Sequence, residues 1–322
     1  MQYPPFFSSV GQEITALKKG IVYKKWEIAL MSLTGKDCQK LLHAITTNEI
    51  ESLKPFSQVE FSFLQANGKM IVPSRALVLN DAVLLEVPES HFQKLAAHLD
   101  KYIIMEDVVV SSEPSALKEY AFHGENIAEK ISALFPGWQK PTGNQVLPYL
   151  DDLFFTYAQN LYGVEGYVLC LPEAMEQKLF QRAMEAGIMP AGFESIQALE
   201  VLYAIPRFEA DYHDAHLPLE VGLKKNISFT KGCYLGQEII ARVDTQSHVV
   251  KNLVQLVWNE PVDIAPGTEL FQEGEPGSVG YTTRSISDGV KTYSLAMMKW
   301  PAIQRSKTVM ANHKAGIVNK IL

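Results

Sequence analysis

A hairpin pattern in the first third of the chain constrains the fold most strongly. Polar and apolar side chains alternate through Val59-Glu60-Phe61-Ser62-Phe63-Leu64, Asn67-Gly68 follows, and residues 70–79 are again largely apolar. Asn-Gly supplies the two positive φ angles of a type I′ turn. The pattern therefore predicts two antiparallel strands joined by a tight turn.

Helix and strand patterns on both sides of this hairpin indicate an α+β fold. Segments 83–87 and 107–111 have strand character, and segment 88–102 between them predicts a helix whose apolar side carries Phe92, Leu95, Ala96 and Leu99. Before the hairpin, Thr34 as N-cap predicts a helix with an apolar stripe of Cys38, Leu41, Leu42 and Ile45. Cys38 is then a small core residue. The order of strand, strand, strand, helix and strand is typical of a small α+β sandwich.

The pattern changes after about Asp244. Upstream, helices are predicted at 127–135, 173–186 and 193–204, with strands at 153–159 and 166–171. Downstream, short apolar strands are separated by Pro-Gly, Glu-Gly and Asp-Gly turns, and no segment has good helical character. This predicts a C-terminal antiparallel β-barrel or sandwich over residues 245–322. We expect residues 1–244 to form two interleaved α+β domains, the hairpin lying in one that spans about 50–115.

Composition and charge exclude several classes of protein. The 322 residues are 47% hydrophobic and 20% charged, which is ordinary for a globular chain and excludes disorder, collagen and a disulfide scaffold. A net charge of −7 argues against a protein that chiefly coats nucleic acid, although the segment from Arg284 onward holds seven basic residues and one acidic residue. That segment could meet RNA or an acidic partner, or simply form solvated strand faces.

The same composition bears on location. The sequence contains no uninterrupted run of about 18 apolar residues, so no membrane span is predicted. Its first residues also lack the pattern of a secretory signal. Three widely spaced cysteines, none in a CxxC pair, suit a reducing cytoplasm and argue against a structural zinc site. We therefore expect a cytoplasmic protein.

The most distinctive string is Phe229-Thr230-Lys231-Gly232-Cys233-Tyr234-Leu235-Gly236-Gln237-Glu238-Ile239-Ile240-Ala241-Arg242. Two glycines bracket a tight turn, and helical character begins at Gln237. Cys233 therefore precedes a helix N-terminus and lies beside Lys231, and both features favour a thiolate. The alternative is an inert structural cysteine. Glu238 and Arg242 are four residues apart and could pair on the helix surface.

Two other features could carry chemistry. Glu200 lies at the edge of an apolar helical arc, where a carboxylate needs a partner. A ligand with two adjacent N–H donors, such as a pterin, would suit it, as would an internal arginine. The run Asp211-Tyr212-His213-Asp214-Ala215-His216 resembles a metal-binding pattern, but it holds only two histidines in a polar loop, so we predict no metal site.

Several of these strings together resemble a known family. Lys231-Gly232-Cys233-Tyr234-Leu235-Gly236-Gln237-Glu238 is similar to the signature of the YgfZ branch of the folate-binding glycine-cleavage T-protein superfamily. Supporting similarities run over nearly the whole chain, at Leu33-Thr34-Gly35, Thr47-Asn48, Asn67-Gly68-Lys69-Met70, Tyr162-Gly163-Val164-Glu165-Gly166-Tyr167, Ile205-Pro206-Arg207-Phe208, Asp211, Leu217-Pro218-Leu219-Glu220-Val221-Gly222-Leu223 and Ile227-Ser228-Phe229.

The resemblance implies a ring of three domains around a central folate site, the last domain being a β-barrel. It implies a tetrahydrofolate or other reduced-folate ligand and a role in iron–sulfur cluster assembly or repair, and thereby in the methylthiolation of tRNA. The family's functional cysteine falls on Cys233, with Lys231 beside it. We expect folate contacts from Glu200, Tyr234, Gln237, Glu238 and Arg242. Iron–sulfur assembly proteins and iron–sulfur tRNA-modifying enzymes are the expected partners, while direct RNA binding stays open.

Two departures from the family pattern leave other functions open. T-proteins that transfer aminomethyl groups use an aspartate that Val87-Pro88-Glu89-Ser90-His91 does not match, which argues against a tetrahydrofolate-dependent one-carbon transferase. The family's pterin-binding glutamate falls on Leu202, two residues after Glu200. A thiol hydrolase would need a histidine within reach of Cys233. A pure interaction protein would need neither the thiol nor a folate.

Overall fold

The computed structural model describes residues 3–149, 154–245 and 249–322 of the chain. The chain forms two compact units. The first comprises residues 1–61 and 72–196, and the second comprises residues 62–71 and 197–322. The second unit therefore includes the tip of a hairpin from the first third of the sequence. Leu153, the predicted start of a strand, and His248 lie outside the described residues.

One sheet of the first unit contains the predicted hairpin. Its strand order is β3-β4-β5-β2-β6. The bounds are β2 Ile28–Thr34, β3 Ser57–Leu64, β4 Met70–Val78, β5 Ala82–Pro88 and β6 Val109–Val110. Helix α2 (Cys38–Ile45) buries the predicted stripe, Cys38 included, and α3 (Phe92–Asp100) buries Phe92, Leu95 and Leu99. The α+β class predicted for this region is confirmed.

The second sheet of this unit is assembled from distant segments. Its strand order is β11-β1-β7-β10-β9-β8. The bounds are β1 Ile21–Lys24, β7 Leu117–His123, β8 Val146–Tyr149, β9 Phe154–Ala158, β10 Gly166–Pro172 and β11 Met189–Pro190. The associated helices are α1 Val10–Ala16, α4 Ile127–Leu134 and α5 Glu176–Glu185, whereas α6 (Phe193–Leu202) begins in this unit and continues into the second. Strands β1, β8 and β11 were not predicted because each has only two to four residues.

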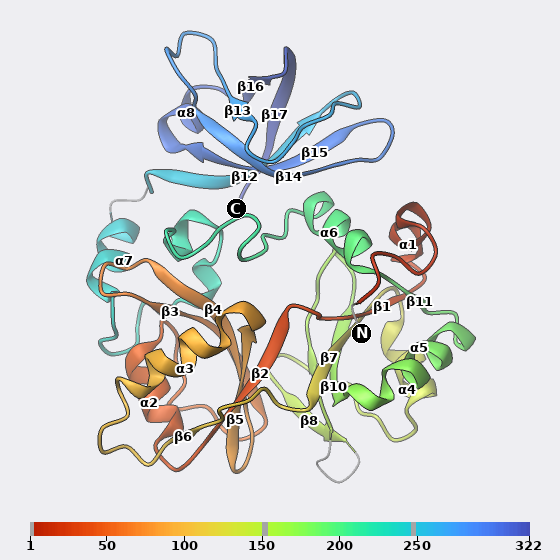
Figure 1. The fold of residues 1–322 in the computed structure, drawn as a ribbon, viewed down its shortest axis with the longest axis vertical. Coiled ribbons are helices and arrows are strands. Elements are labelled where there is room, and N and C mark those ends of the chain that lie inside the picture. Colours follow the sequence, from red (N-terminus) through yellow and green to blue (C-terminus); the bar gives the residue numbers. More distant parts are fainter. Residues whose placement is uncertain (1–2, 150–153, 246–248) are drawn as a thin grey trace. The chain divides into compact units, whose positions relative to one another are not determined.

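The C-terminal segment folds into one six-stranded antiparallel sheet (Figure 1). Its strand order is β13-β14-β15-β12-β17-β16. The bounds are β12 Lys251–Trp258, β13 Glu269–Leu270, β14 Gly280–Ser287, β15 Thr292–Lys299, β16 Thr308–Ala311 and β17 Lys314–Ile321. Phe271 and Met310 exchange two backbone hydrogen bonds of 2.9 and 2.8 Å, which bring the two edges of the sheet together. The predicted barrel is therefore confirmed and is nearly closed.

The barrel encloses its own apolar core, which includes Leu256, Trp258, Met298, Val309 and Val318. The expectation that no helix follows residue 244 is wrong, because α8 covers Trp300–Arg305 and buries Ala302 and Ile303. Pro at the first helical turn is compatible with a helix, since that position needs no donor N–H.

Two local predictions near the hairpin are also wrong. Thr34 ends strand β2, and Asp37 takes the N-cap position of α2. The hairpin turn is not type I′, because Gly68 has a φ of +77° whereas Asn67 is not among the residues with positive φ. Hydrogen bonds from the Gln65 amide to the Lys69 carbonyl and from the Gly68 amide to the Gln65 carbonyl define a three-residue loop with glycine at its left-handed position.

Candidate functional site

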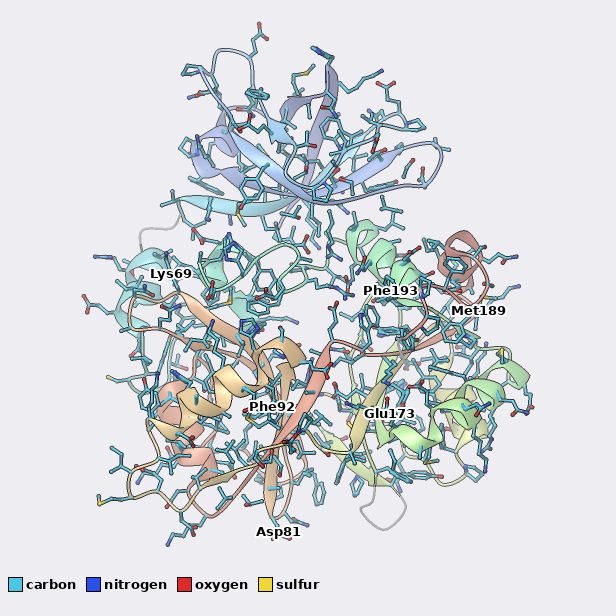
Figure 2. The ribbon with its side chains drawn as sticks, viewed as in Figure 1. Lys69, Asp81, Phe92, Glu173, Met189 and Phe193 are labelled. Atoms are coloured by element: carbon cyan, nitrogen blue, oxygen red, sulfur yellow. The ribbon has the colours of Figure 1, made fainter. Side chains whose placement is uncertain are left out.

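The segment containing Cys233 packs against the tip of the β3–β4 hairpin. Gly236 has a φ of +83°, and a Cβ there would lie 2.7 Å from the Gln65 carbonyl oxygen. A Cβ on Gly68 would lie 2.9 Å from the side chain of Ile239, in helix α7 (Gln237–Thr245). Lys69, labelled in Figure 2, lies in the same turn. Both glycines allow backbone approaches that a side chain would prevent, so the hairpin tip fixes the loop that precedes α7.

Cys233 is the exposed cysteine of the chain, whereas Cys38 and Cys170 are buried. Helical structure begins at Gln237, four residues later, as predicted. Lys231 is 9% exposed and holds its ammonium group 5.1 Å from the centre of the Tyr234 ring. Among the described residues, no histidine comes within hydrogen-bonding distance of the Cys233 sulfur. The thiol is thus accessible, and the hydrolase alternative stays a prediction.

The predicted folate contacts divide into two groups. Glu238 and Arg242 are exposed on α7 and Gln237 is half-buried, so their polar groups can reach a ligand. In the part of the chain that is described, Glu238 and Arg242 form no ion pair with each other, contrary to the i,i+4 expectation. Tyr234 instead packs into a core with Leu64, Met70 and Ile240, and burial raises the pKa of its hydroxyl to about 12.

Glu200, on α6, has the internal arginine partner that the sequence left open. Its Oε2 accepts a hydrogen bond of 2.8 Å from Arg207 Nε and one of 2.6 Å from Arg284 Nη1, and its Oε1 accepts one of 2.7 Å from Arg207 Nη2. Arg284 comes from β14 and also binds Asp211, with Nη2 2.5 Å from Oδ2. Two carboxylates therefore balance two guanidinium groups in a buried cluster. A pterin contact from Glu200 stays a prediction.

The side chains of Asp211, His213 and His216 are engaged in contacts within the protein. Asp211 is fully engaged by Arg284, by Thr283 Oγ1 at 2.6 Å and by the Arg207 amide at 2.8 Å. The His213 and His216 rings lie edge to face with centroids 4.5 Å apart. Burial, aided by Lys251 and His213, lowers the pKa of His216 to about 4, so it is neutral at pH 7. Within residues 3–149, 154–245 and 249–322, no group of three or more potential metal ligands was found.

The first unit contains a buried ionic cluster that sequence reasoning missed. Lys25 Nζ lies 2.9 Å from Glu86 and 2.8 Å from Glu119, and Arg75 Nε lies 2.8 Å from Glu86. The Tyr157 hydroxyl oxygen lies 2.5 Å from Glu86 Oε1 and 2.8 Å from Glu119 Oε1, so its one proton is shared between the two carboxylates. Burial alone would raise the pKa of Glu86, but Lys25 and Arg75 more than offset this and lower it to about 2. The five residues lie on β4, β5, β7 and β9 and after β1, so sequence spacing gives no sign of the cluster.

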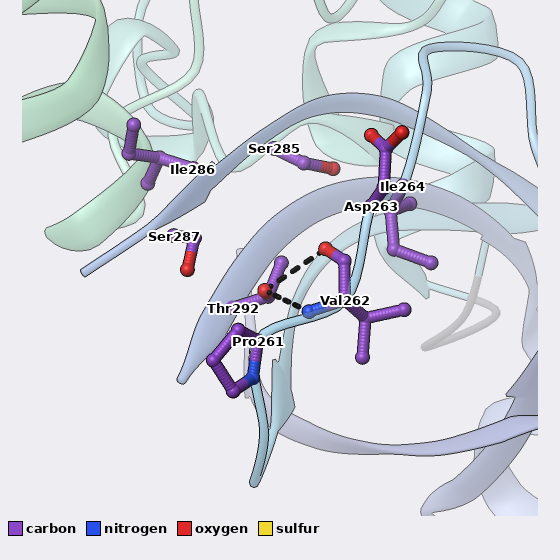
Figure 3. Close-up of a pocket in the computed structure, with 8 residues that line it drawn as sticks. All are labelled: Pro261, Val262, Asp263, Ile264, Ser285, Ile286, Ser287 and Thr292. Carbon is purple, nitrogen blue, oxygen red and sulfur yellow. Dashed lines mark hydrogen bonds between the residues drawn. The ribbon is translucent and has the colours of Figure 1, made fainter. Parts of the chain in front are cut away.

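Two surface pockets lie away from the predicted site residues. One, of about 370 Å³, lies in the barrel (Figure 3) and is lined by Pro261, Val262, Asp263, Ile264, Ser285, Ile286, Ser287 and Thr292. The Thr292 hydroxyl in this pocket already accepts a hydrogen bond from the Val262 amide and donates one to the Val262 carbonyl oxygen. The other, of about 420 Å³, belongs to the first unit and is lined by Lys18, Lys19, Glu125, Asn126, Glu129, Lys130 and Gly187. Neither pocket includes Cys233, Lys231 or Glu200.

Comparisons with known proteins place these features in context. No family model matches the chain. Over 98% of its length the chain is 25% identical to a putative chloroplastic transferase of Arabidopsis thaliana, of which it covers 74%. It is 25% identical over 81% of its length to the tRNA-modifying protein YgfZ of Yersinia enterocolitica, of which it covers 79%. An aminomethyltransferase of Exiguobacterium sibiricum is 23% identical over 75% of the chain, which covers 68% of that protein.

A solved structure shares the fold. The glycine cleavage system aminomethyltransferase T of Bartonella henselae matches with a TM-score of 0.85 at 16% identity, covering 98% of this chain and 90% of that one. The mixed α and β content and the C-terminal barrel therefore belong to a known architecture. Among the described residues, no helix is both long enough and apolar enough to cross a bilayer.

Proposed function

We propose that this chain, a YgfZ-type member of the glycine-cleavage T-protein superfamily, binds a reduced folate and acts in iron–sulfur cluster maintenance, and thereby in tRNA modification. The proposal is supported by similarity to tRNA-modifying YgfZ proteins over about four-fifths of the chain. It is also supported by the Lys231–Glu238 string, which carries the resemblance to that branch.

The observation that carries the proposal is the exposed Cys233 on a loop of fixed backbone. A thiol at such a place can hold a soft metal ion, exchange as a thiolate ligand or attack a one-carbon adduct, whereas a carboxylate does these things poorly. Gly236 and Gly68 fix the loop against α7 and the hairpin tip. Such a loop would present the cysteine to a partner in a fixed position.

The residues around this loop suit a folate in their chemistry. The Gln237 amide, the Glu238 carboxylate and the Arg242 guanidinium can pair with the donor and acceptor edge of a pterin or with a carboxylate. When bound, a reduced folate would supply a carrier for a one-carbon unit. The chain's own residues would bind and orient it.

Complementation of a deletion strain tests the role of the thiol. Cys233→Ala should fail to restore methylthiolated tRNA and iron–sulfur enzyme activity, because the sulfur is required. Cys38→Ala is the matched control, since Cys38 is a core residue, and it should restore both. Full rescue by Cys233→Ala would refute the role assigned to the thiol.

Calorimetry with tetrahydrofolate tests the ligand separately. We expect measurable heat and a rise in thermal stability, because a ligand that binds only the folded state stabilises it. Absence of both at millimolar folate would remove the folate from the proposal while leaving the thiol role to the complementation assay.

A folate-dependent aminomethyl transferase is the second candidate, because one relative is an aminomethyltransferase. The two candidates differ in product. Release of methylene-tetrahydrofolate from an aminomethyl donor by the purified protein at enzymatic rates would favour transfer. We expect none.

A further inference from the structure

The pocket of about 370 Å³ in the C-terminal barrel (Figure 3) lies at one end of the barrel interior. Ser287 pairs with Thr292, and Thr292 pairs with Trp258, where β14, β15 and β12 reach this end of the sheet. Directly opposed residues of antiparallel strands lie on the same face of a sheet, and Trp258 belongs to the barrel core. Ser287 and Thr292 therefore face the interior. We call this pocket the mouth pocket, because it opens at the mouth of the barrel.

The loop on one side of the mouth pocket is anchored at several points. The Thr292 hydroxyl accepts a hydrogen bond of 2.9 Å from the Val262 amide and donates one of 3.0 Å to the Val262 carbonyl oxygen (Figure 3). Asn312 Nδ2 donates to the Asp263 carbonyl oxygen at 3.1 Å, and Ile264 is buried in the barrel core. The backbone around Asp263 is thus held in place, so a ligand would pay little to order it.

Two of the three hydroxyl groups that line the mouth pocket already donate their protons within the protein. The Thr292 hydroxyl is bonded to the backbone of Val262. The Ser287 hydroxyl accepts a hydrogen bond of 3.2 Å from the Gly289 amide and donates one of 3.2 Å to the Lys291 carbonyl oxygen. Neither hydroxyl group therefore has a proton left for a ligand.

The third hydroxyl group, that of Ser285, keeps its proton. Ser285 pairs with Ser294, which pairs with Leu256 of the core, so Ser285 also faces the interior. Its Oγ lies 2.8 Å from Ser294 Oγ, which accepts a hydrogen bond of 3.0 Å from Trp258 Nε1. The buried Ser294 hydroxyl has no other acceptor among the described residues, so it donates to Ser285 Oγ. The Ser285 hydroxyl can therefore donate to an acceptor atom in the pocket.

The mouth pocket has a negative charge in its lining. Among the eight described residues that line it, Asp263 alone is charged. Within the part of the chain that the structure describes, the Asp263 carboxylate forms no ion pair. The charged residues beside the pocket offset one another, since Glu260 pairs with Lys314 at 2.8 Å and Asp288 shares the β14–β15 turn with Lys291. The lining therefore favours a cationic group.

We propose that the mouth pocket binds a small organic amine that carries an oxygen acceptor. Its ammonium group would pair with the Asp263 carboxylate, and its oxygen would accept from the Ser285 hydroxyl. Its apolar body would lie against Pro261, Val262 and Ile264. A volume of about 370 Å³ is at the lower end of the range for small-molecule sites, which often occupy barrel mouths. The inference goes beyond the proposed function and needs neither a folate nor the exposed thiol.

The same groups disfavour other small ligands. An anion would meet the Asp263 carboxylate and a single hydroxyl donor, without a cationic side chain in the described lining to balance it. A purely apolar ligand would cover the Ser285 hydroxyl without accepting its proton, and a covered polar group without a partner costs free energy. An amine with an oxygen acceptor avoids both costs.

Ligand-observed NMR titration of the full chain tests the proposal with three probes of similar size. Tyramine has an ammonium group, a ring and a phenolic oxygen. The compound 3-(4-hydroxyphenyl)propionate has a carboxylate in place of the ammonium group, and phenethylamine lacks the oxygen. Tyramine should bind with a Kd in the millimolar range or below. The propionate should bind roughly 5-fold more weakly or worse, because it loses the ion pair. Phenethylamine should bind roughly 2- to 10-fold more weakly, because it loses one hydrogen bond. No binding of tyramine at millimolar concentration, or equal binding of tyramine and the propionate, would overturn the proposal.

A charge-removing variant places the binding in the mouth pocket. Asp263→Asn should weaken tyramine binding by roughly 5-fold, which is the contribution of a solvent-exposed ion pair. Glu269→Gln is the matched control, because Glu269 is an exposed carboxylate on β13 outside the pocket lining. Both side chains are exposed, so neither substitution disturbs a packed core. Unchanged tyramine affinity in Asp263→Asn, or an equal loss in Glu269→Gln, would refute the site.

A second variant tests the hydrogen bond from Ser285. Ser285→Ala should bring the affinities of tyramine and phenethylamine close together, because the contact that distinguishes the two probes is gone. The binding of phenethylamine itself should change little, so a general loss of structure is distinguishable from loss of this contact. An undiminished preference for tyramine in Ser285→Ala would overturn the arrangement of the ligand in the pocket.

Discussion

At the scale of single residues, the three cysteines occupy two kinds of environment. Cys233 is exposed, whereas Cys38 and Cys170 are buried. Burial, with a smaller effect of Asp107, raises the pKa of Cys38 to about 11. Burial and Glu119 raise the pKa of Cys170 as well. Because the thiolate is the reactive form, access and pKa both protect the two core thiols.

Thiol titration should therefore count one reactive cysteine in the folded chain at pH 8 and three after denaturation. In Cys233→Ser the count in the folded state should fall to zero, with the free energy of unfolding changed by about 0.5 kcal/mol or less, since the residue lies on the surface. Rapid reaction of a second thiol in the folded protein would contradict this picture.

Glu200 accepts three hydrogen bonds from the guanidinium groups of Arg207 and Arg284. Glu200→Ala removes these three charge-assisted hydrogen bonds from a buried ionic cluster, so we expect a loss of about 3–5 kcal/mol in the free energy of unfolding. Glu200→Gln keeps an acceptor oxygen and should cost less. Denaturant titration measures both variants. An alanine variant as stable as the unaltered chain would show that the arginines find other partners.

Acid should weaken the ionic cluster of the first unit through Glu86. Its pKa is lowered from 4.5 to about 2, so its contribution to stability is present above pH 4.5 and is lost as the pH falls toward 2. A shift of this size corresponds to about 3 kcal/mol. The difference in unfolding free energy between the unaltered chain and Glu86→Gln should shrink over that range. A difference independent of pH would contradict the assignment.

At the scale of elements, the two glycines near Cys233 differ in backbone conformation and in the space available for a side chain. Gly236 has a φ of +83° and no room for a Cβ, whereas a Cβ on Gly232 would meet nothing within 4 Å, and Gly232 does not have a positive φ. Gly236→Ala should therefore cost about 1–3 kcal/mol in unfolding free energy and change the reactivity of Cys233. Gly232→Ala is the matched control and should be close to neutral. Equal effects of the two substitutions would refute the fixed-loop description.

The sequence predicts correctly those helices and strands whose hydrophobic periodicity is visible within one continuous segment. The stripe beginning at Cys38 specifies the buried face of α2, and the alternation around Phe61 predicts a strand that forms, although Phe61 to Leu64 are buried on both of its faces. The turn type was wrong because loop length, rather than the Asn-Gly pair alone, decides which residue takes the positive φ. Helix α8 was missed because its six residues are too few to show a period.

The candidate site was predictable to the same extent. Cys233 and its glycines lie in one string, so their proximity follows from the sequence. The partner of Glu200 does not, since Arg284 lies 84 residues further along the chain on another element. Likewise, the cluster of Lys25, Glu86 and Glu119 is assembled by strand order rather than by spacing.

At the scale of the whole molecule, the barrel shares a core with segments outside it. Leu253 and Met297, on the outer face of the barrel, are 0% and 2% exposed. They pack with Leu64 and Met70 of the hairpin and with Tyr234 in one cluster. A domain boundary at residues 244 and 245 stays a prediction, but a cut there would divide this cluster.

Expression of residues 1–244 and 245–322 as separate chains tests how far the barrel folds alone. The barrel keeps its internal core, so the shorter fragment should form β-structure, but burial of Leu253 and Met297 is lost at about 1.5–3 kcal/mol for each side chain. Both fragments should bind a hydrophobic dye and melt at lower temperature than the full chain. Mixing them should reduce dye binding, because the shared cluster can reform. If the fragments neither bind the dye nor change on mixing, the stability of the barrel does not depend on the hairpin. The hairpin tip would then support only the loop that carries Cys233.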